Sequence, residues 1–221
     1  MKTSSFTVAR RFFCASSLAV LAAIAAHAQL APVGLPSQRA LGQRTFDISA
    51  GVVHANVPDV ARNGHAFSAG LNAPVSPNVD LGFNYGYGGI KVLGSGRLTD
   101  WVLSGAAVLH SGGPGAKSFV GASLGYERTK IHVGTLKEND DGGIWALSAG
   151  VEIPLGALTL TPALTYTDAT NGESDSTLHW GLQANYWFTP KVAGYADVTY
   201  SDLRENGDHL WTYRVGARFK L

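Results

Sequence analysis

The chain has 221 residues and a formal net charge of +1, and charged residues make up only 15% of it. Soluble domains average about 25% charged residues, whereas this chain is instead rich in glycine, with 27, and carries eight tyrosines and five tryptophans. No basic surplus suggests a nucleic acid partner. The composition therefore disfavours an ordinary soluble enzyme and a nucleic-acid-binding protein.

Residues 1–28 predict a cleaved signal peptide. A basic start, ending at Arg11, precedes an apolar, alanine-rich stretch that closes with Ala26-His27-Ala28, the small-x-small pattern read by signal peptidase. This stretch is shorter than the roughly 20 residues that a transmembrane helix needs. The segment holds three of the 17 basic residues and none of the 16 acidic ones, so the mature chain is slightly acidic.

The predicted mature chain begins with a short tail. Residues 29–43 contain Pro32, Pro36 and two glycines without periodicity, which predicts a flexible periplasmic tail. The chain's one cysteine, Cys14, lies in the signal peptide, so we expect no disulfide and no thiolate site after export. Composition does not change again, and residues 44–221 are expected to form one domain.

From Arg44 onward the sequence alternates apolar and polar residues with a period of two, which predicts strands with one apolar face. In chain order the alternating segments are 46–52, 67–73, 79–87, 100–110, 120–127, 145–153, 158–167, 178–188, 192–200 and 211–221. Pro162 interrupts the seventh, and because proline cannot donate to a ladder, we expect a bulge or weak pairing there. Ten is an even number, so both chain ends should lie on one side.

The breaks between these segments alternate in length. The longer set is 58–64, 88–96, 134–143, 170–176 and 204–209, and the shorter set is 76–78, 112–117, 156–157 and 190–191. Transmembrane barrels have short periplasmic turns and longer outer loops. The pattern therefore predicts that the longer set faces outward and that both termini are periplasmic.

Large aromatic residues recur at one predicted depth on the apolar face. Strands that would descend from the outer surface open with an aromatic residue, and four ascending strands end with tyrosine. The predicted outer aromatic girdle is Phe67, Tyr87, Trp101, Tyr126, Trp145, Tyr166, Trp180, Tyr200 and Trp211. Amphipathic rings favour the boundary between lipid and water, and Phe46, Phe188 and Phe219 predict a thinner ring at the other boundary.

The opposite face of each strand is mostly Gly, Ser, Thr and Asn. A water-exposed surface would carry more Lys and Glu, so a soluble exported binding barrel is the less favoured reading of the same alternation. A closed barrel leaves no backbone group unpaired in lipid. The sequence thus predicts an all-β protein, a transmembrane antiparallel up-and-down barrel of ten strands, with eight as the alternative, in the outer membrane of a Gram-negative bacterium.

The chain resembles the small outer-membrane barrel superfamily of OmpA-, OmpX- and opacity-type proteins, over residues 44–221. The phrase Gly121-Ala122-Ser123-Leu124-Gly125-Tyr126-Glu127-Arg128 is similar to a strand common in that group. The final alternation from Tyr213 to Leu221 resembles the signal read by the barrel-assembly machinery, an expected partner during biogenesis. The chain departs from the group in ending with Leu221 where phenylalanine is usual, and in having ten strands rather than eight. The resemblance identifies no subfamily.

Eight charged residues are predicted to face the lumen. They are Asp47, Asp80, Asp100, Glu127, Glu152, Asp197, Arg214 and Arg218. Because the last strand must pair with the first, we expect inter-strand ion pairs at this seam, first of all between Arg218 and Asp47. Two interpretations remain: side chains that fill a small barrel, or charges lining a narrow pore, since inward glycines such as Gly51, Gly150 and Gly216 leave space.

No catalytic, cofactor or metal site is expected. His54, His65, His132, His179 and His209 fall near the outward end, but without the close spacing of metal ligands or an acid–base motif. The expected function is structural, surface-related or that of a narrow, porin-like pore in the cell envelope. An enzyme acting on lipid or peptide at the outer rim is the alternative. We expect a monomer whose partners are outer-membrane lipids, including lipopolysaccharide.

Overall fold

The computed structural model describes residues 40–57, 61–92, 96–113, 115–133, 136–170, 176–203 and 208–221. The described part of the chain forms ten strands. They are β1 (Thr45–Val57), β2 (Ala61–Ser76), β3 (Val79–Val92), β4 (Gly96–His110), β5 (Lys117–Val133), β6 (Leu136–Leu155), β7 (Leu158–Ala169), β8 (Thr177–Trp187), β9 (Val192–Leu203) and β10 (Asp208–Lys220). None of the described segments is a helix long and apolar enough to cross a membrane. The predicted signal peptide and residues 29–39 lie outside the described residues.

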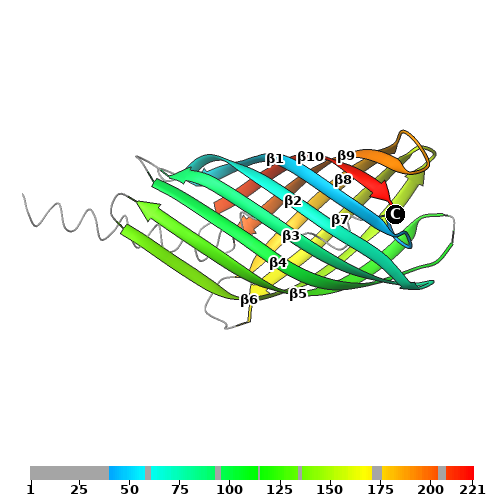
Figure 1. The fold of residues 1–221 in the computed structure, drawn as a ribbon, viewed down its shortest axis with the longest axis horizontal. Helices are drawn as coiled ribbons and strands as arrows, with labels where there is room; N and C mark the ends of the chain where they lie inside the picture. The colour runs from blue at the N-terminus through cyan, green and yellow to red at the C-terminus, as the bar shows by residue number, and fades with distance from the viewer. Residues whose placement is uncertain are drawn as a thin grey trace, which may run out of the picture.

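The strands close into one antiparallel barrel, in which each strand pairs with its neighbours in sequence and β1 pairs with β10 (Figure 1). The closing register runs from Thr45 opposite Lys220 to Asn56 opposite His209. The prediction of a ten-stranded, up-and-down, all-β barrel is confirmed. The start of β1 and the C-terminus lie at one end, which we name the short-turn end; the opposite end is the long-hairpin end.

The barrel is apolar outside and polar inside. Large apolar side chains such as Leu124 and Val215 are 70% and 67% exposed, whereas Asp80, Asp100 and Thr165 are fully buried. A water-soluble barrel would show the reverse, with its apolar side chains buried in the interior. The predicted orientation of the two strand faces is therefore correct, and the exposed outer surface is chemically suited to hydrocarbon.

The predicted outer loops are wrong in one respect: much of their length is strand. The segment 134–143 was expected to be a loop, yet β6 begins at Leu136 and pairs in unbroken register with β5, from Lys137 opposite His132 to Gly142 opposite Glu127. Similarly, β3 continues to Val92 and β4 begins at Gly96. Polar residues occupy both faces here, so no apolar period marks the strand, although the backbone still pairs.

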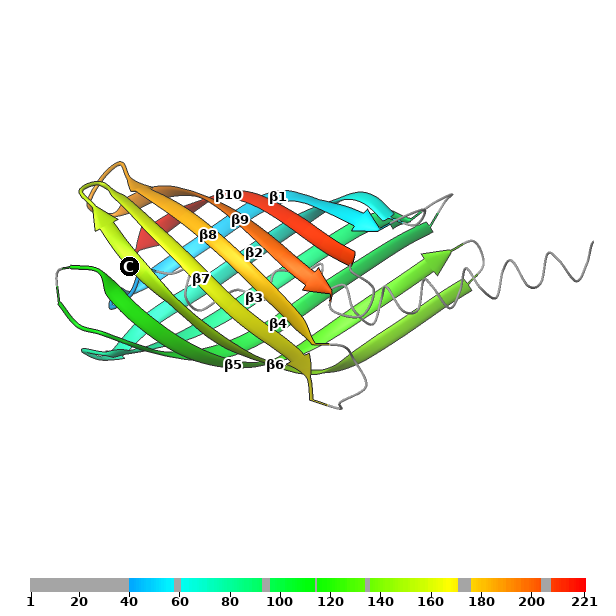
Figure 2. The ribbon, with the colours of Figure 1, turned by 180° about the vertical axis from the view of Figure 1, so that it is seen from behind.

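These extensions make the long-hairpin end asymmetric. Strands β2 to β6 reach further beyond the barrel body than β7 to β10 do, as Figure 1 and, from behind, Figure 2 show. The short-turn end is made of tighter connections. One of them, at Gly156, needs a glycine because its φ is +68°.

The pairing around Pro162 is interrupted but not bulged. Pairs between β6 and β7 run to Gly150 opposite Ala163 and resume at Ile153 opposite Leu160, so the register is unchanged. The prediction of weak pairing holds here, and the alternative of a bulge does not. On its other side Pro162 lies opposite Leu182 of β8.

Candidate functional site: the lumen

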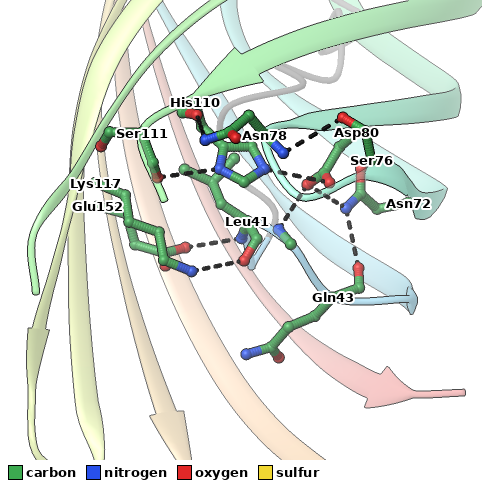
Figure 3. Close-up of polar contacts among 11 residues, drawn as sticks. Leu41, Gln43, Asn72, Ser76, Asn78, Asp80, His110, Ser111, Lys117 and Glu152 are labelled. Atoms are coloured by element: carbon green, nitrogen blue, oxygen red, sulfur yellow. Dashed lines mark hydrogen bonds and ion pairs between the residues drawn. The ribbon is translucent and has the colours of Figure 1, made fainter. Parts of the chain in front are cut away.

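Residues 40–43, the described residues shortly before β1, lie inside the short-turn end of the barrel (Figure 3). The Leu41 amide donates to Glu152 Oε2 at 3.1 Å, and Lys117 Nζ donates to the Leu41 carbonyl at 3.0 Å. The Gly42 amide donates to Asp80 Oδ2 at 2.8 Å. Side chains of β3, β5 and β6 thus form hydrogen bonds with the backbone N–H and C=O groups of this segment from different sides of the lumen.

Leu41 anchors the segment through its side chain. It is 1% exposed and packs with Val108 of β4, Phe119 of β5 and Ala163 of β7, an apolar cluster within a polar interior. Gly42 follows with a φ of +74°, a conformation that side-chain-bearing residues rarely adopt. The expectation of a flexible tail up to residue 43 is therefore wrong for Ala40–Gln43, because buried contacts from distant strands order them. We name Ala40–Gln43 the plug segment.

The wall beside the plug segment is a connected polar cluster centred on Asp80. This buried carboxylate accepts a hydrogen bond from Asn72 Nδ2 at 3.0 Å, and His110 Nε2 lies 3.4 Å from it. Asn72 Nδ2 also donates to the carbonyl of Gln43 at 3.0 Å. The plug segment is consequently tied to β2, β3 and β4 on one side and to β5 and β6 on the other.

We expect Leu41→Ala to loosen the plug segment without unfolding the barrel. Burying a leucine side chain contributes roughly 1.5–3 kcal/mol, so labelling of an Ala40→Cys reporter by maleimide should accelerate by about tenfold or more. Leu147→Ala, which removes an exposed side chain of the outer face, is the control and should leave the rate unchanged. Equal rates in both backgrounds would show that Leu41 does not anchor the segment.

A second group of charged side chains lies along the lumen wall formed by β8, β9 and β10, next to the closing seam. Arg214 Nε donates to Asp197 Oδ1 at 2.8 Å, between two side chains that are 4% and 0% exposed. Arg218 donates to Asn185 Oδ1 at 2.7 Å and its guanidinium lies 5.2 Å from the centre of the Tyr195 ring. These contacts join β8, β9 and β10 on the inside.

The expected inter-strand ion pairing at the seam is present as Arg214 with Asp197. Asp47 and Arg218 are directly opposite one another in the β1–β10 register. An ion pair between these two, the one we expect first, stays a prediction. Asp80 and Glu152 belong to the plug contacts, while Asp100, fully buried on β4, and half-buried Glu127 on β5 lie nearer the long-hairpin end. The eight predicted lumen charges therefore lie at several levels of the barrel.

Three of the inward glycines face large side chains rather than open space. A Cβ placed on Gly216 would lie 2.6 Å from Tyr195 Cζ, and one on Gly51 would lie 2.6 Å from Arg214 Cγ. A Cβ on Gly150 would lie 2.9 Å from Phe119 Cε1. Each glycine is the cross-strand partner of the bulky residue that it accommodates. At these positions the glycines permit filling of the lumen.

His179 forms the one arrangement in the lumen that resembles a catalytic dyad among the described residues. Its Nδ1 is 2.8 Å from Ser201 Oγ and its Nε2 is 2.9 Å from Thr167 Oγ1. Neither contact of the ring involves a carboxylate. The flanking strands use their amides in the barrel ladder, so this described part of the lumen lacks a pair of N–H groups that could bind an oxyanion. The three side chains act as a buried hydrogen-bonded spacer between β7, β8 and β9.

The other predicted histidines do not come together. His54 and His65 lie on the outer face of β1 and β2, where His54 Nδ1 is 2.6 Å from Asn63 Oδ1. His132 and His209 are on β5 and β10, and only His179 is inside. Within the described ranges, no group of three His, Cys, Asp or Glu side chains is placed to hold a metal ion.

The nine residues of the predicted aromatic girdle lie on the outer face in three contacting groups. Phe67, Tyr87 and Trp101 are successive cross-strand partners, and so are Trp180, Tyr200 and Trp211. Tyr126 extends the first group, with its ring centroid 5.7 Å from that of Trp101, and Trp145 and Tyr166 form the third group at 5.4 Å. None of the nine is buried. The thinner ring predicted at the other end includes the stacked pair Phe46 and Phe219.

Solved structures with the same architecture match most of the chain. The translocator domain of the autotransporter NalP from Neisseria meningitidis is 13% identical, with 97% of each chain covered and a TM-score of 0.57. The transport unit of the autotransporter AIDA-I from Escherichia coli is 12% identical, with 93% of this chain and 98% of that chain covered and a TM-score of 0.56. The fold is that of outer-membrane β-barrels.

Smaller barrels also match, among them Neisserial surface protein A, which is 14% identical over 80% of this chain and 97% of that one, with a TM-score of 0.43. No protein-family model and no curated protein matches the sequence. Structural neighbours at this level of identity establish the architecture of the barrel alone. The function of this barrel must be inferred from its own lumen and outer surface.

Several residues of the lumen site are not marked in the sequence. Asn72 and Lys117 contact the plug segment, and Tyr195 and Asn185 contact Arg218, yet each lies in a different strand. The one local signal is Leu41-Gly42, an apolar residue and a glycine just before the first strand. The hydrogen-bonded partners of these two residues lie between 38 and 111 residues away, which places them beyond any periodicity.

Proposed function

We propose that this protein is a closed outer-membrane barrel of a Gram-negative bacterium that works at the cell surface rather than as a pore. It is exported by the signal peptide of residues 1–28 and inserted by the barrel-assembly machinery. The long-hairpin end faces outward, as the alternating turn lengths favour. The barrel acts as a monomer, surrounded by outer-membrane lipids.

The observation that carries this proposal is the double obstruction of the lumen. At the short-turn end the plug segment crosses the interior and is held by Glu152, Lys117 and Asp80. Next to the seam, Arg214, Asp197 and Arg218 are buried against one another and against Asn185 and Tyr195. A conducting path would have to displace both groups of contacts.

The narrow-pore alternative is less well supported. It depended on space beside inward glycines, and that space is occupied by Tyr195, Arg214 and Phe119. The rim-enzyme alternative lacks a nucleophile with an accompanying oxyanion site in the described residues. A surface role is favoured instead by β2 to β6, which extend past the aromatic girdle and expose polar side chains at the β5–β6 tip.

Electrical recording tests the closed lumen. The folded wild-type barrel, inserted in a planar bilayer, should give no steady conductance, and Leu41→Ala alone should stay silent because the Arg214–Asp197–Arg218 group still blocks the interior. Leu41→Ala combined with Arg218→Ala should produce measurable steps. Steady conductance of the wild type would contradict the proposal. Recovery of the protein in the soluble periplasmic fraction would contradict its location.

A further inference from the structure

Six basic side chains gather on the outer face of β3 to β6, beyond the aromatic girdle on the way to the long-hairpin end. Each is an even number of positions away from the girdle residue of its own strand, so it lies on the same outward face, and none of them is buried. We name them the outer basic patch: Lys91, Arg97, Arg128, Lys130, His132 and Lys137.

The register places these basic side chains side by side. Lys91 is directly opposite Arg97 on β4. Arg97 is opposite His132 on β5, which in turn is opposite Lys137 on β6. Like charges directly opposite one another in an antiparallel pair are destabilising. Four strands therefore bring together a row of basic groups that a bound anion would neutralise.

The protein itself offers this face little negative charge. Among the described outward positions of β3 to β6 beyond the girdle, the only acidic residue is Asp141, whose carboxylate accepts a hydrogen bond from the Tyr126 hydroxyl. Glu138 and Asp140 alternate with Asp141 and belong to the other face of β6. Asp141 is the cross-strand partner of Arg128. The other basic side chains of the patch have no acidic residue directly opposite them in the register, so they can bind anions.

The height of the patch limits what can reach it. Arg128 follows Tyr126 by two residues, and Arg97 precedes Trp101 by four, which is about 13 Å along a tilted strand. Aromatic girdles lie at the boundary of the hydrocarbon, so these cations are level with lipid headgroups. The other side of the barrel is different: at similar positions β7 and β9 carry Asp168 and Asp202.

We propose that the outer basic patch binds the phosphates of an anionic lipid of the outer leaflet, the chemistry offered by the phosphorylated sugar headgroup of lipopolysaccharide. The inference rests on the proposed outer-membrane orientation. Arg guanidinium groups can take a phosphate bidentately while Lys acts as a mobile point charge. Tyr87, whose hydroxyl is 3.4 Å from an Arg97 nitrogen, and Trp101 would flank the bound headgroup from the acyl-chain side.

Equilibrium binding of fluorescent lipid A to the folded, full-length mature protein in zwitterionic detergent tests the proposal. The patch variant is Lys91→Gln, Arg97→Gln and Lys137→Gln. The matched control, Arg44→Gln, Lys191→Gln and Lys220→Gln, removes the same charge from the short-turn end. Because several basic groups near an anionic surface act together, the patch variant should raise Kd by about tenfold or more, and the control should leave it within about twofold. The three patch side chains lie on the outer face, and those of Arg44 and Lys191 are exposed. Lys220 lies over the Trp187 ring at the rim of the short-turn end. None of the six belongs to the buried lumen contacts, so both variants should fold.

Two further arms identify the source of the phosphate. Lipid A without phosphates should bind weakly to the wild type, and inorganic phosphate at equal concentration should compete poorly, because it lacks the acyl chains that rest on the girdle. Equal Kd values for patch variant and control, or undiminished binding of dephosphorylated lipid A, would overturn the inference. Conductance of the same preparations tests the proposed function separately. A barrel that conducts no current and binds no lipid A would refute only the proposal of lipid binding. A barrel that conducts and binds lipid A would refute only the proposal of a closed lumen.

Discussion

Asp197→Ala should lower the free energy of unfolding by about 3–5 kcal/mol, because removing one partner of a buried ion pair removes the attraction that offsets the desolvation of the other charge. Asp197 is the hydrogen-bonded acceptor of Arg214 at 2.8 Å, and both side chains are almost fully buried. The Arg214 guanidinium cannot escape to water, since its strand is fixed by pairing with β1 and β9. Reversible urea unfolding of the barrel in phospholipid bilayers measures the change.

The control for this substitution is Asp140→Ala, which removes an exposed carboxylate of β6 and should change stability by no more than about 0.5 kcal/mol. Replacing both partners, Asp197→Leu with Arg214→Met, should recover much of the loss, because no unpaired charge then remains in the interior. A loss for Asp197→Ala as small as that for Asp140→Ala would show that the pair contributes no closure energy.

Gly51→Ala should be the second most damaging change, although it adds a single methyl group. The new Cβ would overlap the backbone carbonyl oxygen of Tyr213 and lie 2.6 Å from Arg214 Cγ. Gly51 and Arg214 are cross-strand partners at the seam where β1 meets β10, so relief requires a backbone shift where the barrel closes. Overpacking of this kind costs about 3 kcal/mol. We expect a lower unfolding free energy and a smaller folded fraction on unheated gels.

Gly105→Ala is the matched control, because nothing lies within 4 Å of the methyl group that it would add to β4. It should fold as well as the wild type, or slightly better, since alanine restricts the unfolded chain more than glycine does. If Gly51→Ala and Gly105→Ala fold equally well, the space beside Gly51 is larger than the structure indicates, and the argument for a filled lumen weakens.

Much of the fold can be derived from the sequence because barrel strands obey a local rule. Leu147 and Ser148 are an example: Leu147 faces outward and Ser148 faces inward, as the two-residue period requires. The same rule placed the aromatic band, since Trp145 and Tyr166 needed only their strand direction and parity to be brought together. Beyond the girdle both faces of a strand carry polar residues, so the alternation that marks a strand is absent. For this reason the sequence did not predict the strand between Leu136 and Gly143.

The candidate site was less accessible to prediction. Asp80 and Glu152 were correctly expected to face inward, but their use as acceptors for the Gly42 and Leu41 amides was not. The partner of a luminal side chain is chosen by the radius of the barrel and the stagger of its strands, which no single strand encodes. The same holds for Arg218, which faces Asp47 in the register and yet also reaches Asn185 on β8.

By itself, the sequence determined an even-numbered barrel, with ten strands preferred over eight, and the face that each strand residue occupies, because these follow from periodicity and parity along the backbone. Only the tertiary structure decided which side chains meet inside the barrel, because those contacts join strands that are far apart in the sequence. They are the contacts of Leu41 and Gly42 from before the first strand, the Arg214–Asp197 pair between β9 and β10, and three glycines opposite bulky neighbours.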